Sequence, residues 1–180
     1  PRSTRKESSA ASDVYKRQPS KISVLPQFID TLSSEDKISG LLEAFKILYA
    51  NKKNIPSKYL KPDSTVSLKD NKYHYKIITD SLLTKKQFIE EDEFDQGIRK
   101  LLNFGHTFGH ALESISSYKI THGVAVGYGM LAAINYVKIT QIIDDRDRSF
   151  YRLIHFLLSQ SSSRNKHLIQ KLFTCKKFLD

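Results

Sequence analysis

The chain has 180 residues, of which 29 are basic and 19 acidic, so its formal net charge is +10 at pH 7. It contains no apolar run of about 18 residues and no leader-like start, which argues against a membrane span or a signal peptide. Its single cysteine excludes an internal disulfide framework and a multi-cysteine zinc cluster. We therefore expect a cytoplasmic protein in which histidine and carboxylate are the credible metal ligands.

Most of the excess positive charge lies near the two ends of the chain. Residues 1–18 carry five basic and two acidic side chains, and residues 164–180 carry five basic and one acidic. No basic motif with interleaved aromatic residues and no zinc-finger spacing occurs. The sequence thus argues against nucleic-acid binding, and the central basic residues fit an anionic small substrate better.

The composition divides the chain into three parts. Residues 1–18 have almost no large apolar residue and no periodicity, which is typical of a disordered or non-native segment. Residues 19–158 carry the helical patterns described next, and residues 159–180 form a basic tail without a chemical signature.

The first predicted helix runs through residues 41–49 and follows Ser33 or Ser34, either of which can cap its amino end. Glu43 and Lys46 are three residues apart on this helix and therefore point the same way. A solvated ion pair is the plain interpretation of that spacing. The apolar stripe contains Leu41, Phe45 and Leu48.

A loop is predicted at residues 51–71, followed by a second helix that carries Lys85 and Lys86 near its end. An acidic patch at residues 90–93 then reads as a solvated turn. The core side of the second helix is predicted to contain Tyr73, Ile77, Ile78, Leu82 and Phe88.

The chemistry is concentrated in residues 101–130, which hold three of the six histidines. His106 and His110 are four residues apart, so on a helix they lie one above the other and can share a cation. A loop is expected at residues 116–119, and His122 then opens another helix. The alternative is that the two histidines bind no metal, because an isolated His-x-x-x-His is usually a surface or helix-capping feature.

Two glycines strengthen the metal interpretation. A glycine inside a helix lowers the stability of that helix by roughly 1 kcal/mol relative to alanine. Because Gly105 and Gly109 lie beside the histidines, we expect another group to approach the helix backbone closely there. Catalytic zinc takes three nitrogen or oxygen ligands from the protein and leaves one position open. Two histidines therefore need a further histidine or a carboxylate, and the chain contains both.

After Met130 the apolar helix is expected to continue to Ile143 and to be broken by the charged run at residues 144–148. A last helix is predicted over residues 150–158, with His155 at the surface or the core edge. No period-two strand occurs, so the predicted fold class is all-α with about five helices. The core positions of the last helix are Phe150, Leu153, Ile154, Leu157 and Leu158.

In this order, the motifs resemble the C-terminal, metal-binding domain of the 3-dehydroquinate synthase family, a branch of the sugar phosphate cyclases. The family pattern G-L-x-E-x-x-K is matched by residues 40–46, and a lysine (Lys85) and an acidic pair (92–93) follow. G-x-R-x-x-L-N-x-G-H-T-x-G-H-A-x-E is matched by residues 97–113, and residues 122–123 close the pattern. Because many residue types match in the same order over about ninety positions, the complete pattern identifies the family far more specifically than an isolated His-x-x-x-His motif does.

The resemblance implies that Glu43, His106 and His122 bind a zinc or cobalt ion and that His110 faces the substrate. Residues 19–158 would then be the metal- and substrate-binding domain, and the full-length protein a homodimer acting on an anionic sugar phosphate. The planar guanidinium of Arg99 suits a carboxylate of the substrate, and the lysines supply point charges for its anionic groups. Further contacts with the substrate are implied for Lys46, Lys85, Asp95, Arg99 and Asn103.

By resemblance, the reaction uses NAD to oxidise an alcohol; phosphate is then eliminated, the ketone is reduced again, and the opened sugar closes into a carbocycle. The family's Rossmann-type domain, which holds NAD, has no counterpart here, since no glycine-rich dinucleotide loop precedes Glu43. We therefore expect a fragment that is inactive alone. The chain also departs from the family at Asp95 and Val124, where glutamate is usual, and only weakly matches a late lysine at Lys176 or Lys177.

Three alternatives remain open. The first is another cyclase of the valiolone or deoxy-inosose type, although Arg99 and Asn103 favour a substrate that carries a carboxylate. The second is an inactive metal-binding module. The third, an unrelated zinc hydrolase, lacks the expected base, because Glu113 is seven residues from His106 and does not form a His-Glu-x-x-His motif.

Overall fold

The computed structural model describes residues 21, 23–51, 71–140, 144–162 and 165. These residues contain helices and no strand, which confirms the all-α prediction. None of the described helices is both long and apolar enough to span a membrane. The elements are η1 (Pro26–Thr31), α2 (Ser34–Ala50), α3 (Asn71–Glu91), η3 (Ile98–Asn103), α4 (His106–Ile115), α5 (His122–Thr140) and α6 (Asp145–Ser159).

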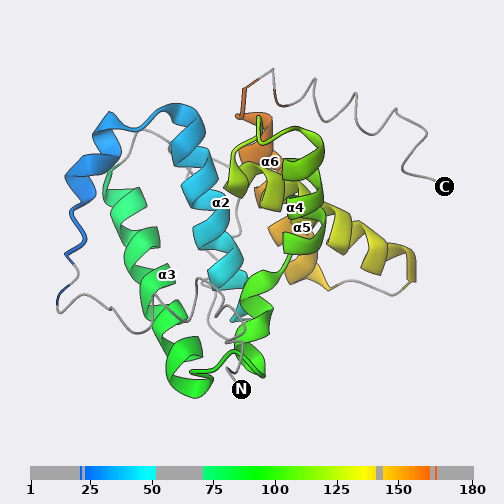
Figure 1. Ribbon diagram of the computed structural model, residues 1–180, viewed down its shortest axis with the longest axis horizontal. Helices are drawn as coiled ribbons and strands as arrows, with labels where there is room; N and C mark the ends of the chain where they lie inside the picture. The colour runs from blue at the N-terminus through cyan, green and yellow to red at the C-terminus, as the bar shows by residue number, and fades with distance from the viewer. Residues whose placement is uncertain (1–20, 22, 52–70, 141–143, 163–164, 166–180) are drawn as a thin grey trace, which may run out of the picture.

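Helix α2 lies at the centre of the molecule, with α3 on one side and α4, α5 and α6 on the other (Figure 1). Ser33 caps its amino end as predicted, because its side-chain oxygen accepts the backbone N–H of Asp36 at 3.1 Å. The apolar residues of α2 are buried on several sides, since three helices pack around it. They include Ile38, Leu41, Leu42, Phe45, Leu48 and Tyr49.

Helix α3 is present as predicted, but its predicted core side is partly wrong. Leu82 is 45% exposed, while Ser81 and Thr84 are buried. Both hydroxyls donate to backbone carbonyls of their own helix, Ser81 at 2.9 Å and Thr84 at 2.8 Å, so they are satisfied inside the protein. The buried stripe therefore includes polar residues that an apolar pattern does not reveal. Its members are His74, Ile77, Ser81, Thr84 and Phe88.

Helices α4 and α5 pack together unusually closely, and glycines make this contact possible. Gly105 has a φ of 81°, and a Cβ added there would lie 2.7 Å from the side chain of Met130. A Cβ on Gly129 would lie 2.0 Å from the carbonyl oxygen of Gly105. The close neighbour predicted at Gly105 and Gly109 is therefore helix α5.

Helix α6 begins five residues earlier than predicted. Asp144 caps it by accepting the backbone N–H of Asp147 at 2.7 Å, and acidic residues in the first turn favour the positive end of a helix dipole. The charged residues 144–148, which were predicted to break a helix, therefore form the start of α6. The five predicted core residues of α6 are buried and His155 is exposed, as predicted.

Three predictions fall on residues that the structure does not describe. They are the interior of the loop expected at residues 51–71, the terminal segment 1–18, and most of the basic tail 159–180 with the weak lysine match at Lys176 or Lys177. The apolar helix continues past Met130 as predicted, to Thr140, and only its last predicted residues, 141–143, lie outside the described part.

Candidate metal centre

Three histidines from two helices meet at one place. His106 and His110 lie on consecutive turns of α4, and His122 is the first residue of α5. The ring centroid of His106 lies 5.1 Å from that of His110 and 5.3 Å from that of His122. One ring nitrogen of each residue lies within 4.8 Å of the others, which is a spacing suited to one shared cation.

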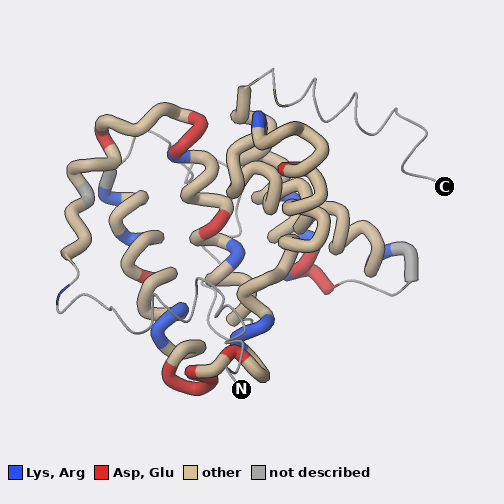
Figure 2. Tube along the Cα trace, in the orientation of Figure 1, with Lys and Arg blue, Asp and Glu red and all other residues tan. Residues whose placement is uncertain are grey.

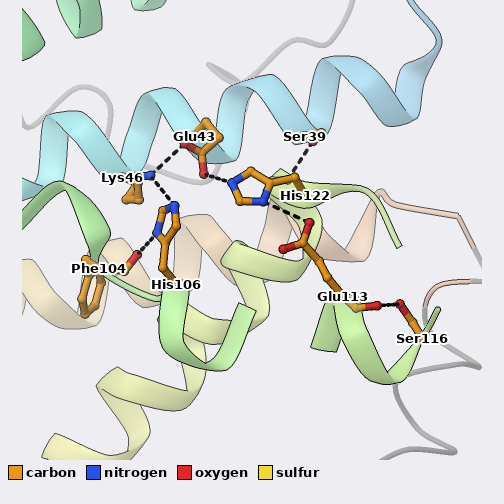
Figure 3. A network of polar contacts seen from close by, with 9 residues as sticks. Ser39, Glu43, Lys46, Phe104, His106, Glu113, Ser116 and His122 are labelled. Carbon is orange, nitrogen blue, oxygen red and sulfur yellow. Dashed lines mark hydrogen bonds and ion pairs between the residues drawn. The ribbon is translucent and has the colours of Figure 1, made fainter. Parts of the chain in front are cut away.

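Helix α2 brings a carboxylate to the same place (Figure 3). The backbone N–H of Gly123 donates to Ser39 Oγ at 3.0 Å, and a Cβ on Gly123 would lie 2.1 Å from the Ser39 carbonyl oxygen. This contact sets α5 directly against α2. Glu43, one helical turn beyond Ser39, consequently faces His122, with Oε1 at 3.7 Å from Nε2.

The two oxygens of Glu43 have different surroundings. Oε2 accepts a hydrogen bond from Lys46 Nζ at 2.7 Å. Oε1 is buried and has no hydrogen-bond partner among the described residues, although the side chain as a whole is 31% exposed. A buried carboxylate oxygen without a partner is costly, and a cation relieves that cost.

The donor set fits a zinc or cobalt ion. Zinc binds imidazole nitrogen at about 2.0–2.1 Å and carboxylate oxygen at about 2.0–2.2 Å, so one ion between Glu43 Oε1 and His122 Nε2 can reach both. His106 presents Nε2 to the same side, because its Nδ1 lies 3.5 Å from the Phe104 carbonyl oxygen, to which it donates.

Lys46 is buried, with only 5% of its side chain exposed, and its Nζ lies 3.4 Å from His106 Nε2. The plain interpretation of Glu43 and Lys46 as a solvated pair is therefore wrong. Burial lowers the pKa of Lys46, the bond to Glu43 opposes this shift, and the charge of Lys85 adds to it. Burial, and then the charge of Lys46, also lower the pKa of His106, which favours the neutral imidazole that metals bind.

The sequence did not predict the role of Glu113. Its Oε1 lies 3.1 Å from His122 Nδ1, and its side chain is 13% exposed. The sequence places Glu113 only at the end of the family motif and as a poorly placed hydrolase base. Metal-binding histidines usually have a carboxylate or carbonyl partner, and that rule would have suggested Glu113 as a candidate.

The remaining predicted site residues lie near the carboxyl end of α3 and in the segment after it. Lys85 is exposed near the end of α3, Asp95 is exposed with a φ of 56°, and Asn103 is the exposed last residue of η3. Arg99 donates through Nη1 to the Glu93 carbonyl oxygen at 2.9 Å. Figure 2 shows that this region combines the acidic turn after α3 with basic residues on both sides.

Asp92 organises the turn that carries Arg99. Its Oδ1 accepts the backbone N–H of Gln96 at 3.0 Å, and its Oδ2 accepts those of Gly97 and Arg99 at 2.7 and 3.0 Å. These bonds, the one from Gln96 first, lower the pKa of Asp92. The acidic patch predicted to be a solvated turn thus contains a structural carboxylate.

A cavity of about 630 Å³ is lined by none of the three histidines and by none of the other predicted site residues. Its wall is mostly apolar and includes Tyr49, Phe88, Leu101, Phe104 and Ile134.

Comparison with known proteins assigns the fold to a family. The model of the family described as 3-dehydroquinate synthase C-terminal matches residues 40–177. The 3-dehydroquinate synthase of Macrococcus caseolyticus is 38% identical over 125 residues, which are 63% of this chain and 33% of that protein. The one from Clostridium tetani is 50% identical over 70 residues, 39% of this chain and 18% of that protein.

A third relative, the 3-dehydroquinate synthase of an Exiguobacterium species, is 39% identical over 118 residues, which are 64% of this chain and 33% of that protein. The chain thus spans about a third or less of the length of these curated relatives. The match over residues 40–177, together with the helical fold, shows that the chain belongs to the 3-dehydroquinate synthase family, within its C-terminal domain.

Proposed function

We propose that this chain is the metal- and substrate-binding part of a carbon–oxygen lyase of the 3-dehydroquinate synthase type. One observation carries the proposal: Glu43 Oε1 is buried without a hydrogen-bond partner among the described residues, and it faces His122 Nε2 at 3.7 Å. That arrangement, with His106 alongside, supports a cation site built from three helices.

Glu43, His106 and His122 hold a zinc or cobalt ion in this proposal. When bound, the ion supplies Lewis-acid polarisation and a template for two adjacent substrate oxygens. His110 is exposed beside these residues and faces the substrate. A set of three histidines without Glu43 is the competing choice of ligands, since one ring nitrogen of each lies within 4.8 Å of the others.

The substrate is an anionic seven-carbon keto acid sugar phosphate. Lys46, Lys85 and Arg99 give the site a positive potential, and the guanidinium of Arg99 offers a planar fork to the carboxylate. Asp95 and Asn103 contact the hydroxyls from the segment around η3. NAD would supply the hydride acceptor and donor of the reaction, and a part of the enzyme outside these helices would hold it.

The choice of ligands is tested by zinc stoichiometry in purified variants. Glu43→Ala and His106→Ala should lose bound zinc, while His110→Ala and His155→Ala should retain one ion per chain. Retention by Glu43→Ala together with loss by His110→Ala would assign the ion to the three histidines.

The function is tested by release of inorganic phosphate. The chain should release none from the keto acid sugar phosphate with NAD and zinc, because the hydride acceptor is not positioned without its domain. A fusion to the N-terminal part of the Macrococcus caseolyticus relative should release it, and Arg99→Ala should abolish the release while exposed Arg152→Ala leaves it intact. Turnover by the chain alone, or equal effects of the two arginine variants, would contradict the proposal.

A further inference from the structure

Glu113 and His122 are nine residues apart and face one another across the connection between α4 and α5 (Figure 3). Glu113 lies in the last turn of α4 and His122 begins α5. The distance of 3.1 Å between Oε1 and Nδ1 is that of a hydrogen bond. The contact therefore links one end of the proposed metal centre to a carboxylate that is only 13% exposed.

The connection between α4 and α5 positions Glu113 close to His122. The carbonyl oxygen of Glu113 accepts bonds from Ser116 Oγ at 2.9 Å and from the backbone N–H of Tyr118 at 2.8 Å. Ser117 and Tyr118 both adopt a positive φ, of 54° and 57°, which non-glycine residues rarely do. The helix end that carries Glu113 is thus held in place while the chain turns back towards His122.

The hydrogen bond determines which nitrogen of His122 is available. An ionised carboxylate only accepts hydrogen bonds, so His122 Nδ1 must carry the hydrogen. In the neutral imidazole, Nε2 then has the free lone pair, and Nε2 is the nitrogen that lies 3.7 Å from Glu43 Oε1. His106 is arranged in the same way, with the Phe104 carbonyl oxygen accepting from its Nδ1.

We propose that Glu113 is a positioning residue, which holds His122 in the Nδ1-protonated tautomer with Nε2 directed at Glu43 and the metal. This inference rests on the proposed metal centre. Outer carboxylates of this kind orient histidine ligands, and their loss typically weakens metal binding by about 10- to 100-fold.

The test compares Glu113→Ala, Glu113→Gln and the exposed control Glu90→Ala. Zinc affinity is measured by competition with a chelator. Glu113→Ala should weaken zinc binding by about 10- to 100-fold, whereas Glu113→Gln, whose side-chain oxygen still accepts from Nδ1, should stay close to wild type. Glu90→Ala should not change the affinity. A loss in Glu113→Gln as large as in Glu113→Ala, or no loss in either, would overturn the proposal.

A second measurement does not depend on metal. Nitrogen-15 NMR of the metal-free protein at about pH 8, where an ordinary imidazole is neutral, reports the tautomer of His122. Nδ1 should be protonated in wild type and in Glu113→Gln, and the preference should disappear in Glu113→Ala. An unchanged tautomer would refute the role of Glu113, whereas absence of zinc binding in wild type with the expected tautomers would refute only the metal centre.

Discussion

The carboxylate of Glu43 stabilises a buried lysine as well as facing the histidines. Removing one partner of a buried ion pair costs about 3–5 kcal/mol, and the partial exposure of Glu43 reduces that to about 1–3 kcal/mol. We therefore expect Glu43→Ala to lower the free energy of unfolding of the metal-free protein by this amount in urea denaturation.

The matched control is Glu90→Ala. Glu90 pairs with Lys86 at 3.5 Å, but both side chains are more than 60% exposed. Exposed pairs of this kind contribute little, so the loss should be below about 0.5 kcal/mol. Equal losses in the two variants would show that the pair of Glu43 with Lys46 is as solvated as its spacing suggested.

Asp92 makes the turn before η3 sensitive to acid. Its folded-state pKa is lowered, so its stabilisation is complete above the ordinary aspartate pKa of about 3.9 and is lost as the pH falls through the lower folded value. The amide NMR signal of Gly97, which donates to Asp92 Oδ2, should therefore titrate with a midpoint below about 3.9. Asp92→Asn should abolish this titration; a midpoint at or above the ordinary value would contradict the prediction.

At the scale of elements, the contact between α2 and α5 decides whether Glu43 meets His122. A Cβ on Gly123 would lie 2.1 Å from the Ser39 carbonyl oxygen, so the two helices must separate in Gly123→Ala. We expect a loss of about 1–3 kcal/mol in stability, as for other overpacked sites, and weaker zinc binding. Denaturation and chelator competition measure the two effects.

Gly40→Ala, on α2, is the control for this substitution. A Cβ there meets nothing within 4 Å, so the variant should gain about 0.5–1 kcal/mol from the better helix propensity of alanine. Tolerance of Gly123→Ala would mean that α2 and α5 are not held together as described, and destabilisation by Gly40→Ala would mean that a Cβ at Gly40 does not project into open space.

At the scale of the whole molecule, a bound ion would join α2, α4 and α5. A ligand that binds only the folded state stabilises it by about 2.7 kcal/mol at a free concentration 100 times its dissociation constant. Zinc should therefore raise the melting temperature in calorimetry. His106→Ala should remove this increase and His155→Ala should retain it; an increase in both would place the ion elsewhere.

Local patterns in the sequence were sufficient for the helices and for the family. The cap was predicted to be Ser33 or Ser34 and His122 to be the start of a helix, because capping and periodicity depend on residues a few positions apart. The family followed from the order of short motifs, and the match over residues 40–177 confirmed it. The start of α6 was missed because its charged first turn resembles a helix break.

Only the tertiary structure decided how these pieces meet. Burial of Lys46 and the buried face of α3 depend on helices that pack from elsewhere in the chain, and no local pattern records them. Glu43 faces His122 because Gly123 contacts Ser39, which is 84 residues away. Such contacts depend on the distance between helix axes, which is set by the small residues at their crossing and becomes visible only when both helices are in place.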